Sequence, residues 1–195
     1  MKWTMPSLLA CAWLVSLPAL AQEANGCPEG SYSIVMSPDG TTLSILFDQF
    51  ALASSGHAVS GRQSKVCRIS SPLNLPAESS IGVYKVDYRG FAKLVAKQET
   101  ELDVQYFLGP HDNQHGRVFK RKIKGPQEGD YVFTETIGAG QMKRIGCGAA
   151  AMLNVDITLS LDGDLRAGDA MASLDTADAA PGGALVFHLN LKKCS

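Results

Sequence analysis

The sequence predicts an all-β protein, a single antiparallel β-sandwich of about eight or nine strands, with a β-barrel as the alternative. Apolar and polar residues alternate along several stretches, and no stretch after Gly26 shows the 3.6-residue period of a helix. Glycine, proline and serine separate these stretches, as they do between strands joined by turns. Strands with one polar face are typical of antiparallel sheets, whose outer faces meet water.

The N-terminus has the features of a secretory signal peptide. Lys2 precedes an apolar run that ends in an A-x-A cleavage site at Ala21. We therefore expect residues 1–21 to be removed, which leaves residues 22–195 as one secreted or periplasmic domain. The alternative is a lipoprotein with Cys11 as the lipidated residue, which would leave an apolar mature N-terminus without a role. No later segment is long and apolar enough for a transmembrane span.

The first two predicted strands, residues 31–36 and 42–48, form a hairpin. The turn between them reads Ser-Pro-Asp-Gly. Pro38 presets its φ angle, Asp39 can bond to the nearby backbone, and Gly40 accepts a positive φ.

Later stretches alternate in the same way. In residues 81–94, Tyr84 and Tyr88 share a face and are expected in the core, opposite Asp87 and Arg89. By contrast, small and polar residues predominate between 162 and 183, which predicts a long loop. The other alternating strands are expected over residues 154–162 and 185–193.

A second hairpin is predicted from charge. Residues 99–108 are acidic and residues 117–124 are basic, so pairing them places opposite charges across the ladder. This pairing neutralises the basic run, and the whole chain has 18 basic and 19 acidic residues. We therefore expect no nucleic-acid partner. The predicted opposite pairs are Phe107–Val118, Gln105–Lys120, Asp103–Lys122 and Glu101–Lys124.

An exported chain with four cysteines after the signal peptide predicts two disulfides, for which three pairings exist. Strands 154–162 and 185–193 are expected to pair antiparallel, which brings Cys147, before the first, close to Cys194, at the end of the second. The remaining pair is Cys27–Cys67, and the first hairpin returns the chain toward Cys27. A zinc site of these four cysteines is disfavoured because no two have close C-x-x-C spacing.

The sequence resembles the secreted family catalogued as domain of unknown function 4360. The resemblance covers nearly all of the mature chain and includes the four cysteines. It implies a small exported protein of bacteria or fungi and no assigned activity. The loop GPHDNQHGR at 109–117 departs from the family pattern, so a function located there would be particular to this chain. The matching phrases are GCPEGSYSIVMSPDGTTLSILFDQF, YKVDYRGFAKL, KGPQEGDYVFTETI, CGAAAMLNVDITLSL and LVFHLNLKKC.

The candidate metal site is His111, Asp112 and His115, in that loop. Two imidazoles and a carboxylate within five residues are ligands for zinc or copper. The competing interpretation, which we favour, is a polar turn without a cofactor, because Gly-Pro and Asp-Asn are turn sequences.

No other catalytic constellation is evident, since the sequence lacks a G-x-S-x-G elbow, an H-E-x-x-H motif and a phosphate-binding glycine loop. His188, on the polar face of its strand, is expected to be solvated, and His57 has no partner nearby. The polar face of residues 154–162, with His188 and Asn190 beside it, is expected to be an ordinary solvated face. Asp87 and Arg89 are expected to form a structural ion pair, with each other or with a neighbouring strand.

These observations favour a non-catalytic exported module that binds an extracellular protein or glycan, with the oligomeric state left open. Its loops are natural binding surfaces. The alternative is a secreted metal-dependent hydrolase centred on the His111 and His115 loop. A third interpretation is a coat or matrix subunit that assembles through edge strands.

Overall fold

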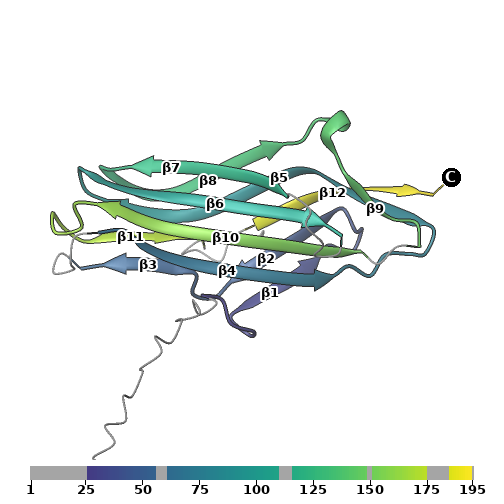
Figure 1. The fold of residues 1–195 in the computed structure, drawn as a ribbon, viewed down its shortest axis with the longest axis horizontal. Helices are drawn as coiled ribbons and strands as arrows, with labels where there is room; N and C mark the ends of the chain where they lie inside the picture. Colours follow the sequence, from purple (N-terminus) through teal and green to yellow (C-terminus); the bar gives the residue numbers. More distant parts are fainter. Residues whose placement is uncertain (1–25, 56–60, 110–115, 149–150, 175–184, 195) are drawn as a thin grey trace, which may run out of the picture.

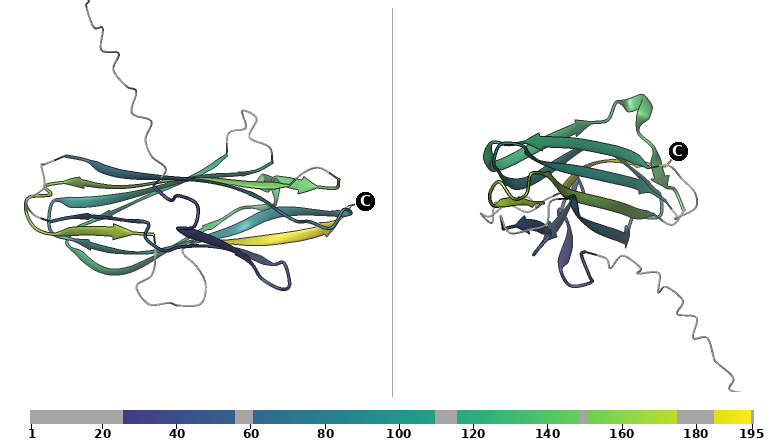
Figure 2. Two further views of the ribbon diagram at one scale, coloured as in Figure 1. Left: turned by 90° about the horizontal axis from the view of Figure 1, so that it is seen from below. Right: turned by 60° about the vertical axis from the view of Figure 1, so that its left-hand side comes forward.

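The computed structural model describes residues 26–55, 61–109, 116–148, 151–174 and 185–194. Two antiparallel sheets pack face to face without closing into a barrel (Figures 1 and 2), which confirms the predicted all-β sandwich. The larger sheet has eight strands and the smaller has four, in the order β4 (Gln63–Pro72), β10 (Met152–Gly163), β6 (Gln98–Leu108) and β7 (Arg117–Lys124). The described residues therefore contain more strands than predicted, because β3 (Ala51–Ser54), β9 (Arg144–Gly146) and β11 (Ala170–Ser173) are too short to show alternation.

The long strand β5 organises the larger sheet. One edge of β5 pairs with β12 and then β11, and its other edge pairs with β9 and then β8. The elements are β1 Tyr32–Met36, β2 Thr42–Phe47, β3 Ala51–Ser54, β4 Gln63–Pro72, β5 Ser79–Leu94, β6 Gln98–Leu108, β7 Arg117–Lys124, β8 Gln127–Thr136, the 3-10 turn η1 Ala139–Gln141, β9 Arg144–Gly146, β10 Met152–Gly163, β11 Ala170–Ser173 and β12 Leu185–Lys193.

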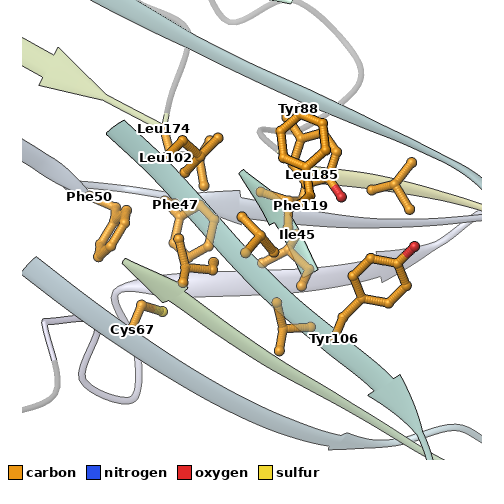
Figure 3. Close-up of a cluster of buried hydrophobic side chains, with 14 of the residues drawn as sticks. Ile45, Phe47, Phe50, Cys67, Tyr88, Leu102, Tyr106, Phe119, Leu174 and Leu185 are labelled. Atoms are coloured by element: carbon orange, nitrogen blue, oxygen red, sulfur yellow. The ribbon is translucent and has the colours of Figure 1, made fainter. Parts of the chain in front are cut away.

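The core lies between the two inner faces, where aromatic rings from opposite sheets meet. Tyr88 of β5 stacks on Phe119 of β7, with ring centroids 3.8 Å apart. Tyr106 of β6 meets Phe187 of β12 edge-on at 5.2 Å. Figure 3 shows several of these side chains. Such contacts add stability beyond burial and fix how the sheets face each other.

The first hairpin forms as predicted, with β1 paired to β2 through the Ser-Pro-Asp-Gly turn. Gly40 has a φ of 66°, and its amide donates to the Ser37 carbonyl. Asp39 accepts hydrogen bonds from the Ser37 hydroxyl and from both the amide and the hydroxyl of Thr41. These bonds, that of Ser37 foremost, lower the pKa of Asp39 to about 2.

The β6–β7 hairpin also forms, but two residues away from the predicted register. A shift by two keeps every side chain on its predicted face, so acidic and basic residues still meet. The observed register aligns one more acid–base pair than the predicted one did. Lys120 lies 2.8 Å from Asp103, and Lys122 lies 2.7 Å from Glu99. The observed opposite pairs include Glu99–Lys124, Glu101–Lys122 and Asp103–Lys120.

Two predictions about the C-terminal third were wrong. Strands β10 and β12 do not pair, because β10 is central in the smaller sheet and β12 belongs to the larger. The predicted loop over 162–183 contains β11, which pairs with β3 and β5. Its residues, AMAS, are too small to show an apolar stripe, and pairing on both edges stabilises the strand instead.

The two disulfides are Cys27–Cys67 and Cys147–Cys194, the predicted pairs. The second arises by a different route from the one predicted. Strands β9 and β12 both pair with the start of β5, on opposite edges, and the amides of Cys147 and Cys194 donate to Ser79 and Glu78. Within the described ranges, no helix has the length and apolar character of a membrane span.

Candidate functional site

A buried carboxylate lies between the sheets. Glu135 of β8 points inward, and its side chain is only 14% exposed. Its Oε1 accepts from Nε and Nη2 of Arg117 at 3.0 and 2.6 Å. Its Oε2 accepts from the hydroxyls of Tyr88 and Tyr106 at 3.1 and 3.2 Å. Four strands, β5, β6, β7 and β8, thus meet at one carboxylate, whose acceptor sites are all occupied.

Burial governs the titration of this cluster. It raises the pKa of Tyr88 and of Tyr106 well above the usual range, and the negative charge of Glu135 adds to both shifts. For Arg117, burial acts to lower the pKa, but the hydrogen bond and charge of Glu135 outweigh it and raise the pKa. Both tyrosines therefore remain neutral donors and Arg117 remains a cation.

Beside this cluster lies a pocket of about 150 Å³, here called the end pocket. It opens at the end of the sandwich where β6 ends, β7 begins and the segment after η1 folds across. Apolar groups form much of its wall, and the polar side chains among the described residues are a guanidinium, an amide, an ammonium and the phenol of Tyr106, whose hydroxyl bonds to Glu135. Its lining residues are Val83, Tyr106, Phe107, Leu108, Gly116, Arg117, Ile137, Gln141, Met142 and Lys143.

The wall formed by Met142 and Lys143 depends on a close approach to β5. A Cβ atom at Gly82 would lie 2.6 Å from the Met142 sulfur and 3.3 Å from the Lys143 carbonyl oxygen, so a larger residue would displace the Met142 side chain from this wall. Arg144 holds the segment in place by donating to the carbonyls of Ser80 and Asn190 at 3.0 and 2.9 Å. The Cys147–Cys194 disulfide follows directly in the chain and links it to the end of β12.

A second polar cluster, here called the outer-face cluster, lies on the solvent side of the larger sheet. A bulge between His188 and Leu189 shifts the β5–β12 register, which pairs Lys85 with His188 and Val83 with Leu189. Tyr84 lies between these two pairs and has no opposite residue on β12. It is 40% exposed, and the centroid of its ring lies 5.9 Å from that of the His188 ring. Tyr84 therefore lies outside the core, contrary to the prediction, while Tyr88 is buried as predicted.

Asp87 is the centre of the outer-face cluster. It accepts from Thr134 at 2.6 Å, and its other oxygen lies 2.8 Å from Nε2 of His188 and 3.1 Å from Nζ of Lys85. Asp87 forms its ion pair with Lys85 of its own strand and not with Arg89, and its ionisable partner on a neighbouring strand is His188 of β12. His188, expected to be solvated, is a half-buried partner of this carboxylate.

The outer-face cluster predicts a stability that depends on pH. Burial acts to raise the pKa of Asp87, but the hydrogen bonds of Thr134, His188 and Lys85 outweigh it and hold the pKa below 3.8. The charged form therefore stabilises the fold above that value, and this contribution is lost as the pH falls through the lowered pKa.

We expect Asp87→Asn to lower the free energy of unfolding by roughly 1–2 kcal/mol at pH 7 and by less at pH 3. Urea unfolding across this pH range measures the difference. The matched control is Asp103→Asn, because Asp103 forms an exposed pair with Lys120 that contributes about 1 kcal/mol or less. A loss at Asp87 that is equally large at both pH values would contradict the expectation.

The predicted metal ligands His111, Asp112 and His115, and also His57, lie outside the described residues. The structure does describe the polar face of β10, which is not beside His188 and Asn190, because β12 is in the other sheet. Part of this face is also structural rather than solvated. Asn154 is buried, donates to the Gly109 carbonyl at 2.8 Å and accepts from Ser70 at 2.6 Å.

Sequence reasoning missed both Glu135 and the role of Arg117. A signal for Glu135 exists, since it occupies an inward position in the alternating run Tyr131, Phe133, Glu135, Ile137. A charged residue at an apolar position of a strand needs a buried partner. Arg117 was grouped with the basic run, from which its inward orientation separates it.

Comparisons with known proteins identify the family of the chain. Residues 16–194 match the family described as Domain of unknown function (DUF4360). The chain belongs to this family. It is 25% identical, over 183 residues, to an "Uncharacterized secreted protein" of the fungus Arthroderma benhamiae (strain ATCC MYA-4681 / CBS 112371), covering 93% of this chain and 72% of that protein. Together with the two disulfides, the secreted relative confirms that the DUF4360 chain is an exported protein.

One solved structure, TmCBM61 in complex with beta-1,4-galactotriose, also resembles the chain. It is 15% identical and the match covers 85% of this chain and 84% of that one, with a TM-score of 0.24. A TM-score this low does not establish a shared fold.

Proposed function

We propose that this exported protein is a non-catalytic binding module that holds part of an extracellular ligand in the end pocket. The observation that carries the proposal is the pocket itself, an opening of about 150 Å³ with apolar walls and a few fixed polar groups. Concave apolar sites with a small number of oriented polar groups are typical of ligand recognition. The network around Glu135 holds Arg117 in place before any ligand arrives, which lowers the entropy lost on binding.

The carboxylates of Glu135 and Asp87 support binding rather than catalysis. Glu135 already accepts four hydrogen bonds, and Asp87 is bonded to Thr134, His188 and Lys85. A general base needs a free acceptor within reach of a proton on the substrate. Within the described residues, no group of three or more His, Cys, Asp or Glu side chains is arranged to hold a metal ion.

An array of extracellular glycans and peptides, probed with residues 22–195, tests the proposal. We expect retention of at least one member and a loss of at least tenfold in the variant Gln141→Trp, whose exposed side chain would fill the pocket mouth. The control is Gln127→Trp, which changes an exposed glutamine of β8 that does not line the pocket. This variant should bind like the wild type. Equal binding by both variants, no retention by the wild type, or cleavage of an array member would overturn the proposal.

The metal-dependent hydrolase remains a separate prediction, which depends on His111, Asp112 and His115. Metal analysis of the purified mature chain, beside the double variant His111→Ala/His115→Ala, decides it. Near-stoichiometric zinc or copper that disappears in the double variant would support a metal site, and an equally low metal content in both would refute it.

A further inference from the structure

The polar side chains of the end pocket carry positive charge. Arg117 and Lys143 line it, and no carboxylate of the described residues does. Glu135 lies behind Arg117, but its two oxygens already accept four hydrogen bonds and have no capacity for a ligand. The described part of the pocket therefore offers mainly donors to a ligand, and its acceptors are the Gln141 amide, the Tyr106 hydroxyl and backbone carbonyls.

Arg117 is positioned as a recognition group. Glu135 binds its Nε and Nη2, which leaves the Nη1 side of the guanidinium turned away from this carboxylate. Its side chain is 35% exposed, on the pocket wall. A guanidinium held from one side keeps its remaining donors at a fixed orientation, and these donors match the geometry of a carboxylate.

Lys143 adds a second cation at the rim. It is exposed, and no carboxylate of the described residues lies within ion-pair distance of it. Its charge is therefore not cancelled as those of Arg117, Lys120 and Lys122 are. The local field favours an anionic ligand over a neutral one of the same shape.

We infer that the end pocket recognises a carboxylate on a compact hydroxylated ring, the chemistry of a uronic acid unit in an acidic glycan. Arg117 and Lys143 bind the carboxylate. The Gln141 side chain, both donor and acceptor, bonds hydroxyl groups, and Phe107 and Met142 cover the apolar face of the ring. A volume of about 150 Å³ suits one such ring. This inference rests on the proposed function and names the ligand class of the same pocket.

Chemical-shift titration of ¹⁵N-labelled residues 22–195 tests the inference. The probes are D-glucuronate, D-glucose, N-acetyl-L-leucine and inorganic phosphate at constant ionic strength. We expect D-glucuronate to shift the amides of Leu108, Gly116 and Lys143, and D-glucose to shift them at least tenfold less. Lys143→Gln should weaken glucuronate binding at least fivefold, whereas Lys93→Gln, at an exposed lysine that pairs with Glu128, should not change it.

Each other outcome overturns the inference in a distinct way. Equal shifts with D-glucose would reject the acid but retain the pocket as a binding site. Tighter binding of N-acetyl-L-leucine would point to a peptide C-terminus, and tighter binding of phosphate to a phosphorylated ligand. If no probe shifts the pocket amides and array binding persists in Gln141→Trp, the proposed function fails as well.

Discussion

Removal of a disulfide is expected to produce the largest loss of stability in this protein. For Cys147→Ser/Cys194→Ser, we expect the free energy of unfolding to fall by about 4 kcal/mol, because the bridge closes a ring with a sequence separation of 47 residues. The loss arises mainly in the unfolded chain, which gains conformations when the ring opens. Urea unfolding of the mature chain under non-reducing conditions measures it.

The matched variant is Cys27→Ser/Cys67→Ser, whose separation of 40 residues predicts a similar loss of about 4 kcal/mol. The two variants should differ at the end pocket. Only the loss of Cys147–Cys194 frees the chain that follows β9, so only that variant should shift the amide resonances of Met142 and Lys143. Identical shifts in both variants would contradict the assigned role of this bridge in holding the pocket wall.

Removal of the buried carboxylate is expected to have the second largest effect. Glu135→Leu leaves Arg117 and the hydroxyls of Tyr88 and Tyr106 without their acceptor, in a site where water only partly replaces it. We expect a loss of roughly 3 kcal/mol in the free energy of unfolding, below the upper range for a fully buried pair because Arg117 is 35% exposed. Urea unfolding at pH 7 measures this loss.

The control for this experiment lies on the same strand. Glu128 pairs with Lys93 at the surface and is 65% exposed, so Glu128→Leu should cost about 1 kcal/mol or less. Glu135→Gln removes the charge but keeps the shape of the side chain. It should lower the free energy of unfolding by less than Glu135→Leu does, because the amide oxygen still accepts from Arg117. Comparable losses at Glu128 and Glu135 would show that the cluster contributes no more than a surface pair.

The β6–β7 hairpin shows what the local sequence pattern can predict about strand pairing. The charges of the β6–β7 hairpin correctly predicted which residues share a face, because side chains alternate with a period of two. The predicted register was nevertheless wrong by two residues. A shift by two residues preserves the faces, and the observed register aligns three acid–base pairs, Glu99–Lys124, Glu101–Lys122 and Asp103–Lys120, so the charges counted over the whole hairpin favour it.

Tyr84 shows a second limit. Its alternation with Val86 and Tyr88 predicts a buried ring, and a regular strand would place it there. The bulge opposite His188 inserts one residue into the pairing and turns Tyr84 to the outer face. A bulge depends on how two distant strands fit together, so alternation within one of them does not reveal it.

The sequence by itself determined the all-β class, the first hairpin and its turn, and the presence of two disulfides in this DUF4360 protein. Most of these features depend on residue type and on spacing along a few neighbouring positions. Only the tertiary structure decided which strands share a sheet, and with it the end pocket and the cluster around Glu135. The residues of that cluster lie on four strands, and they meet because hydrophobic burial packs the two sheets together, a property of the whole chain rather than of any segment.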